Sequence, residues 1–444
     1  MKRLIFILLL SNFLTPVYFV HAEAQPLSLE ECMRYAVSHA TSVGERELDL
    51  ADSRTDYRAA IASLFPSVSG SVGGSTNFGR SIDPATNAYT EVTTFSNSYG
   101  LSASMPLFAG LQQINTLRAA RVARELGQVD VEVARDEVAI ATLKAYMDVV
   151  YYTQAVEIAR EQLEAAHETL RQATKQYELG LKSAADVAEM ESQEANYDYL
   201  LTTEEHNRAL AYIRLAEVMN WSEAAQLEVV TDFTIDLPLS ATTEEELIDY
   251  ALENNAQIRS ARLTTRIQKL QYARAKGGYL PSLNLSGGVN TSYFIDFDHK
   301  SAYDPFWNQF RNNRGSYVSL SLSIPIFSGL NRRSAKYRAQ NNLHRAELSA
   351  RALEQSLRSE VSQSWQQMVG NGKLYVQGQK KVRAAQLAYD GAKKKFENGL
   401  ISALDLQTAA NTLLQAKSDR LRARLEYIIQ SRMVDYYNGE PLVR

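Results

Sequence analysis

One stretch of this chain, Pro106 to Asp186, occurs twice, and the duplication limits what the chain can fold into. Pro106-Leu107-Phe108-Ala109-Gly110-Leu111 opens the first copy, and Pro325-Ile326-Phe327-Ser328-Gly329-Leu330 opens the second. In both copies a Tyr/Phe-Glu-x-Gly-Leu motif begins 71 residues after the proline, and a Ser-x-x-Asp motif follows it. A repeat that keeps its register over 219 positions indicates a tandem duplication of one structural unit.

The two 71-residue intervals have the composition of long helices. Apart from the prolines that open them they contain no proline, and they are rich in strong helix formers such as alanine, leucine, glutamate and lysine. We predict two long helices and two return helices, at about 111–179, 184–220, 330–398 and 403–438. At 1.5 Å per residue each long helix would extend roughly 100 Å. Gly370, Gly372 and Gly378 have no counterparts in the first copy and predict a kink or a local break.

Ahead of each long helix the apolar period changes from 3.6 residues to 2, which is typical of β-strands. We predict four strands, at about 67–78, 96–108, 283–294 and 317–327. Each has an apolar face and a face of serine, asparagine and glycine, as in the alternation from Val318 to Ser323. This pattern matches outer-membrane strands around a watery interior. A sheet with one face on a soluble core is the alternative.

Four strands cannot close a membrane barrel, because the smallest closed barrels need about 8 and an open edge in lipid leaves backbone groups unsatisfied. The strand pattern therefore predicts a barrel shared between copies, with two copies giving 8 strands and three giving 12. The polar loops at about 79–95 and 295–316 would face outside the cell. There they would either meet lipid headgroups or shield the pore mouth, and the second loop is rich in aromatic residues. Disordered loops are the alternative.

The N-terminus has the layout of a secretory signal peptide over residues 1–24, with Lys2-Arg3, an apolar run and Ala22-Glu23-Ala24; an N-terminal membrane anchor is the alternative. We predict a first structural repeat over 25–242, which includes an equatorial linker at 221–242, and a second repeat over 243–444. The formal net charge of −4 argues against nucleic acid as a partner. Cys32 is the only cysteine and is interpreted as a buried helical thiol.

This ordered, duplicated set of motifs resembles the TolC outer-membrane efflux protein family over essentially the whole mature chain. The resemblance implies a mainly α fold with a membrane β-barrel, in which a homotrimer forms 12 strands continued by a long periplasmic α-helical barrel. It implies the exit duct of a tripartite efflux or type I secretion system in a Gram-negative outer membrane. The partners implied are a periplasmic adaptor, an inner-membrane pump and outer-membrane lipid.

The same resemblance places the two turns between long and return helices at the periplasmic tip, where an adaptor would dock. The docking residues implied are Gly180, Leu181, Ser183, Gly399, Leu400 and Ser402. The motifs also have a purely structural interpretation, because each glycine can cap a helix C-terminus and each Ser-x-x-Asp can form a capping box for the returning helix. Capping does not exclude docking or gating, since all three can use one turn.

The resemblance further implies a periplasmic gate that includes Asp186 and Asp405. Asp405 matches a position where family members carry an acidic ring, but the family's second acid is Thr408 here. Phe396 and Ile401 offer no polar side chain to lock the tip, so an apolar constriction is predicted.

We expect passive conduction and no enzymatic activity, cofactor or metal site, because histidines are scattered and no phosphate loop or Cys/His metal spacing occurs. The rival is a periplasmic adaptor or coiled-coil scaffold. That class would have one helical hairpin flanked by soluble β-modules, whereas this sequence predicts two hairpins and four strands.

Overall fold

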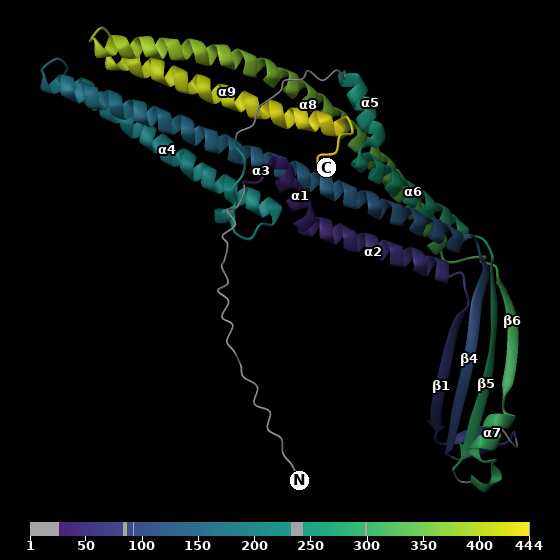
Figure 1. Ribbon diagram of the computed structural model, residues 1–444. Helices are drawn as coiled ribbons and strands as arrows, with labels where there is room; N and C mark the ends of the chain where they lie inside the picture. The colour runs from purple at the N-terminus through teal and green to yellow at the C-terminus, as the bar shows by residue number, and fades with distance from the viewer. Residues whose placement is uncertain (1–25, 83–86, 92, 232–242, 298–299, 444) are drawn as a thin grey trace, which may run out of the picture.

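The computed structural model describes residues 26–82, 87–91, 93–231, 243–297 and 300–443. The chain is elongated, with a narrow β-sheet at one end and the closed ends of two long helical hairpins at the other (Figure 1). The predicted signal peptide, 1–24, and the second half of the predicted linker, 232–242, lie outside the described residues.

Each half of the chain contributes the same kinds of element in the same order. The first half contains α1 (Leu29–His39), α2 (Thr41–Ala62), β1 (Ser67–Asn77), β4 (Thr94–Ala109), α3 (Gln112–Glu178) and α4 (Ala184–Met219). The second half contains α5 (Glu244–Asn254), α6 (Ala256–Gly277), β5 (Ser282–Asp296), β6 (Gly315–Ser323), α8 (Asn331–Glu397) and α9 (Ala403–Tyr437). Smaller elements are β2 (Arg80–Ile82), β3 (Tyr89–Glu91), α7 (Phe306–Asn312) and two 3₁₀ turns, Ala224–Gln226 and Lys300–Ala302. The long helices α3 and α8 both have 67 residues and are therefore roughly 100 Å long.

The main sheet is antiparallel, with the strand order β1-β4-β5-β6. Ser67 pairs with Ser104 in the first hairpin and Ser282 pairs with Ser323 in the second, so both hairpins have the same register. Serine hydroxyls bond across the polar face, for example Ser69 with Ser102 at 3.0 Å. Strands β1 and β6 are left as the two outer edges.

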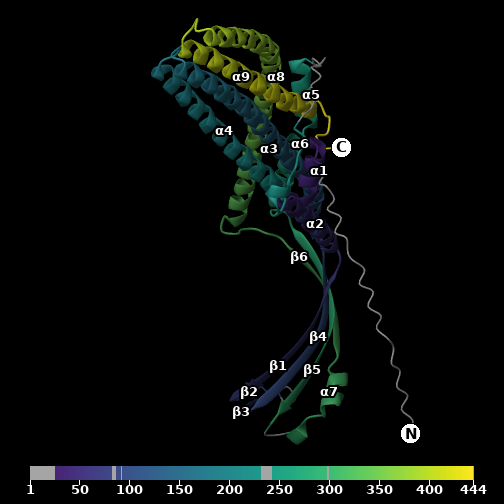
Figure 2. The same cartoon turned by 60° about the vertical axis from the view of Figure 1, so that its left-hand side comes forward.

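The helices near the sheet follow a matching order. Helix α2 packs against α3, α3 packs against α6, and α6 packs against α8, so that α2 and α8 end the row. Towards the far end the chain forms two antiparallel hairpins, α3 with α4 and α8 with α9, which lie side by side (Figures 1 and 2).

The largest apolar core lies where α1, α3 and α4 meet, at mid-length of the molecule. Leu143, Tyr146 and Val150 of α3 are buried there against Leu215 and Met219 of α4. Cys32 of α1 is completely buried in this cluster, and burial raises the pKa of its thiol to about 12. A thiol with that pKa is protonated at neutral pH and unreactive.

The glycines of the second long helix do not break it. Helix α8 is continuous from Asn331 to Glu397, so of the two predicted outcomes the local break is wrong. The helix follows a curved course (Figure 2), and the predicted kink at the glycines stays a prediction. A Cβ on Gly372 would lie 3.3 Å from the Tyr427 ring, and one on Gly378 would lie 3.2 Å from Cβ of Arg420. Because both contacts are to α9, these glycines let the two helices approach closely.

Strand β6 ends at Ser323, which corrects the predicted end at 327. Ser323 pairs with Ser282, the first residue of β5, so within the single chain no neighbouring strand remains for the residues that follow. Pro325 also lacks a backbone N–H to donate to a ladder. Ile326, which the strand prediction included, is 95% exposed in the single chain.

Candidate functional site at the helical tip

The turn between α3 and α4 closes with a glycine in the left-handed conformation. Gly180 has φ +75°, and its N–H donates to the Tyr177 carbonyl at 2.8 Å. The N–H of Leu181 donates to the Gln176 carbonyl at 2.8 Å, which completes a Schellman motif. Glycine is required here because an L side chain at this φ is strained.

The turn between α8 and α9 repeats this geometry. Gly399 has φ +70° and donates to the Phe396 carbonyl at 2.9 Å, while Leu400 donates to the Lys395 carbonyl at 2.8 Å. The predicted C-terminal caps therefore occur at both turns.

Both return helices begin with the capping box that the motifs predict. In α4 the Ser183 hydroxyl donates to the Asp186 carboxylate at 2.8 Å, and the Asp186 N–H donates back to the hydroxyl at 3.2 Å. In α9 the matching distances for Ser402 and Asp405 are 2.7 and 3.2 Å. Hydrogen bonds from these serines lower the pKa of both aspartates, so both are ionised at neutral pH.

Leucine side chains project from the two turns. Leu179 is 74% exposed, and Leu181 and Leu400 are each 73% exposed. We call these three residues the tip leucines. Clustered exposed apolar side chains at the end of a molecule are typical of a contact surface for another protein.

Phe396 lies inside the chain, between the two hairpins. It is 2% exposed and packs with Ala173 of α3, Met190 of α4 and Leu406 of α9. The Lys182 ammonium, from the first turn, sits 3.4 Å from the centre of the Phe396 ring. This is a cation–π contact between hairpins that are far apart in sequence.

The structure divides the predicted gate residues into two groups. Ile401 is half-buried against the cluster around Phe396, so these two side chains come together within one chain. Asp405 and Thr408 lie on the exposed side of α9, and the Thr408 hydroxyl donates to its own helix, to the Leu404 carbonyl at 2.8 Å. Asp186 caps the other hairpin.

Sequence reasoning missed Lys182 as a contact residue. A comparison of the two repeats contains the signal, because Lys182 occupies the position that Ile401 has in the second copy. Tyr177 and Phe396 are matched in the same way. Positions where a duplicated turn keeps its backbone but changes its side chains mark places where the two hairpins act differently.

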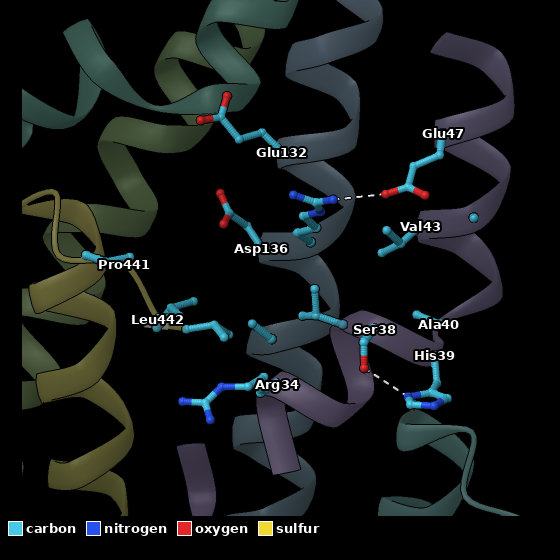
Figure 3. A pocket seen from close by; sticks show the side chains of 15 residues that line it. Arg34, Ser38, His39, Ala40, Val43, Glu47, Glu132, Asp136, Pro441 and Leu442 are labelled. Carbon is cyan, nitrogen blue, oxygen red and sulfur yellow. Dashed lines mark hydrogen bonds and ion pairs between the residues drawn. The ribbon is translucent and has the colours of Figure 1, made fainter. Parts of the chain in front are cut away.

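A hollow of about 630 Å³ lies at mid-length, where α1 meets α2 beside α3 and the C-terminal segment (Figure 3). Polar side chains around it bond to one another: Arg135 donates to Glu47 at 2.9 Å, and the Tyr436 hydroxyl donates to Asp136 at 3.0 Å. Burial raises the pKa of Asp136. These contacts join α2, α3 and α9, so we interpret the hollow as a joint between helices.

Within the described ranges, no three or more His, Cys, Asp or Glu side chains are grouped so as to hold a metal ion. None of the helices in the described part of the chain has a stretch apolar and long enough to cross a membrane.

The fold matches those of solved membrane-channel proteins. It matches the solved structure of CusC with a TM-score of 0.80 at 16% identity, over 93% of this chain and 92% of CusC. It also matches the outer membrane protein VceC of Vibrio cholerae, with a TM-score of 0.77 at 15% identity, over 93% of this chain and 96% of VceC.

Sequence comparison gives the family. The model of the outer membrane efflux protein family matches residues 34–220 and 247–438, one stretch in each half, so the chain belongs to this family. The outer membrane protein TolC of Vibrio cholerae is 25% identical over 342 residues, covering 75% of this chain and 74% of the relative. The chain is thus an efflux or secretion exit duct of the Gram-negative outer membrane, with a periplasmic extension, in a family of channels rather than enzymes.

Proposed function

We propose that three copies of this chain close into one channel that conducts substrates passively from a periplasmic adaptor and an inner-membrane pump to the exterior. Twelve strands would form the barrel, and the helices would continue it into the periplasm. The chain itself would catalyse nothing and carry no cofactor, the pump supplying the energy.

The observation that carries this proposal is the shared order of the sheet and the helix row. Strand β1 and helix α2 end both layers on one side, and β6 and α8 end both on the other. A second copy that joined its β1 and α2 to β6 and α8 of the first would continue both layers at once. Such a head-to-tail interface closes into a ring when its rotation divides a full turn evenly.

The faces of the sheet support a membrane position for the strands. Val68, Val318, Leu320 and Leu322 lie on one face and are more than half exposed in the single chain. Serines occupy the opposite face, which would line the water-filled interior.

The tip would serve as docking surface and gate. The tip leucines would meet apolar side chains of the adaptor, and Asp405 of three copies would form one acidic ring near Thr408. Phe396 would act from inside the protomer, where its contact with Lys182 holds the two hairpins together. Adaptor binding would favour the form in which the hairpins separate, a population shift by differential affinity.

The internal duplication predicts the register of the interface between copies. Pro66 of the first repeat matches Pro281 of the second, and Pro106 matches Pro325. The strand pairs of the two hairpins match in the same way, because Ser67–Ser104 corresponds to Ser282–Ser323. Ser104 of β4 pairs with Ser286 of β5. By the same correspondence, Ser104 matches Ser323 of β6, and Ser286 matches Ser71 of β1. We therefore expect Ser323 of one copy to pair with Ser71 of the next.

Disulfide trapping in outer membranes tests this register. We expect the double variant Ser71→Cys/Ser323→Cys to form covalent dimers and trimers on oxidation and nothing larger. Ser71→Cys/Ser319→Cys is the matched control, since Ser319 faces the same side about 13 Å further along the strand. Cys32 can stay, because it is buried and protonated.

The protein-only mass in mild detergent, by light scattering, gives the second readout. Three chains are expected. Covalent species larger than a trimer in the trapping experiment would indicate an open filament. A stable monomer in the soluble periplasmic fraction would refute the shared barrel.

A further inference from the structure

The short helix α7 lies at the end of the sheet away from the long helices (Figure 1). Its Phe306 ring is 5.2 Å from the ring of Tyr293, and its Phe310 ring is 5.3 Å from that of Tyr99. The register places Tyr99 and Tyr293 on the same face of the sheet as Leu101. Helix α7 therefore rests on the apolar face and not over the serine-lined face.

Side-chain hydrogen bonds fix α7 in this position. Strand β5 continues past the start of β6, so the backbone of Phe294 has no strand partner on that side. The buried Gln309 takes its place: the Gln309 amide donates to the Phe294 carbonyl at 2.9 Å and accepts from the Phe294 N–H at 3.0 Å. The Thr291 hydroxyl also donates to the Phe310 carbonyl at 2.7 Å.

A hollow of about 600 Å³ opens on the apolar face beside α7. The side chains that matter in its lining are Val72, Tyr99, Leu101, Val289, Phe310 and Arg314. The three aliphatic side chains are each more than half exposed in the single chain. The hollow thus has an apolar floor and one guanidinium group in its wall.

Two arginines lie at the C-terminal end of α7, Arg311 within the helix and Arg314 just after it. Over the whole loop, 295–316, they and Lys300 are balanced by three acids, Asp296, Asp298 and Asp304, so the positive charge is local to this end of α7. The Arg314 Nε donates to the backbone carbonyl of Arg311 at 3.0 Å, which holds the Arg314 guanidinium against the last turn of α7. Arginine binds phosphate oxygens through two parallel N–H bonds, and exposed aromatic residues such as Trp307 are typical of the level of lipid headgroups.

We propose that this hollow binds a phosphorylated, multiply acylated glycolipid of the outer leaflet. One acyl chain would lie on Val72, Leu101 and Val289, and Arg311 and Arg314 would bind a phosphate. The inference rests on the proposed function, because the loop end of the sheet faces the outer leaflet only if the helices are periplasmic. It decides between the two roles that the sequence left open for this loop, in favour of the lipid.

The test uses the full-length protein in mild detergent and bis-phosphorylated lipid A as the probe, with bound lipid counted by native mass spectrometry. We expect Arg311→Gln/Arg314→Gln to weaken retention of lipid A at least tenfold. Arg332→Gln/Arg333→Gln, which removes two arginines at the start of α8, is the matched control and should bind as the wild type does. Dephosphorylated lipid A should bind the wild type as weakly as the bis-phosphorylated form binds the Arg311/Arg314 variant.

Unchanged retention by Arg311→Gln/Arg314→Gln would overturn the proposal. Equal retention of phosphatidylglycerol and lipid A would overturn the assignment to a glycolipid and indicate a general phospholipid site. The oligomeric mass in the same native mass spectra separates a failure of the lipid-site proposal from a failure of the proposed channel function. A trimer that does not retain lipid A refutes only the lipid site, whereas a monomer refutes the proposed function itself.

Discussion

A close approach between two glycines joins the sheet to the helices and gives a sharp stability prediction. Gly110, in the turn after β4, lies against Gly277, the last residue of α6. A Cβ on either glycine would come within 3.0 Å of the carbonyl oxygen of the other, a separation that real Cβ atoms essentially never show. Alanine at either position must therefore move backbone, not merely a flexible side chain.

The two substitutions should differ in size. Gly277→Ala introduces the clash alone, and overpacking of this kind costs about 1–3 kcal/mol. Gly110 also has φ +60°, so Gly110→Ala adds about 1–2 kcal/mol for the left-handed conformation. With an unfolding entropy of ~2.1 cal/mol/K per residue, a loss of ~3 kcal/mol lowers the melting temperature of a chain of this length by about 3 °C.

The melting temperatures of the purified variants in detergent can be measured by monitoring circular dichroism during heating. Gly370→Ala is the control, because nothing lies within 4 Å of a Cβ there and the residue is inside α8. Alanine should leave the melting temperature unchanged or raise it. If Gly110→Ala and Gly277→Ala both unfold at the melting temperature of the wild type, the backbone around these two glycines relaxes without cost and the prediction is wrong.

Two further predictions concern the tip. Lys182→Met keeps the aliphatic stem but removes the charge that faces the Phe396 ring, which costs the cation–π contact about 1 kcal/mol. This loss should raise the open-to-closed ratio in single-channel recordings about fivefold. Lys175→Met, which changes an exposed lysine of α3, is the control and should leave the ratio unchanged. The lowered pKa of Asp186 predicts that its capping contribution is present above about pH 4 and is lost as pH falls through that lowered pKa. Asp186→Asn should therefore melt below the wild type at pH 7, and this difference should shrink as the pH falls below about 4.

Much of the fold follows from local patterns in the sequence. The long helices run where proline is missing, and their ends follow from Gly180 and Gly399, whose conformation needs glycine. Strand positions follow from the period of two. These features depend on residues only a few positions apart, so a single sequence contains them.

The errors arose where packing between distant segments decides the outcome. The local cost of glycine in a helix predicted a kink or a break in α8, but the helix is continuous, and Tyr427 and Arg420 of α9 pack where side chains of Gly372 and Gly378 would lie. The end of β6 depends on where its partner β5 begins. The contact of Lys182 with Phe396 joins residues of different repeats, and no local pattern contains it.

The duplication also explains why one tip turn differs from the other. In the proposed ring of three, hairpins would meet within each copy and between copies, and the duplicated backbone would make the two contacts geometrically similar. Within a copy Lys182 faces Phe396, so the matching contact between copies brings Ile401 to Tyr177 of the next copy. The first contact has a charge on a buried ring, whereas the pair of Ile401 and Tyr177 has no charged group. We therefore expect the contact between copies to be the weaker one and the tip to open there first, with the Lys182 contact within each copy breaking at a later step of opening.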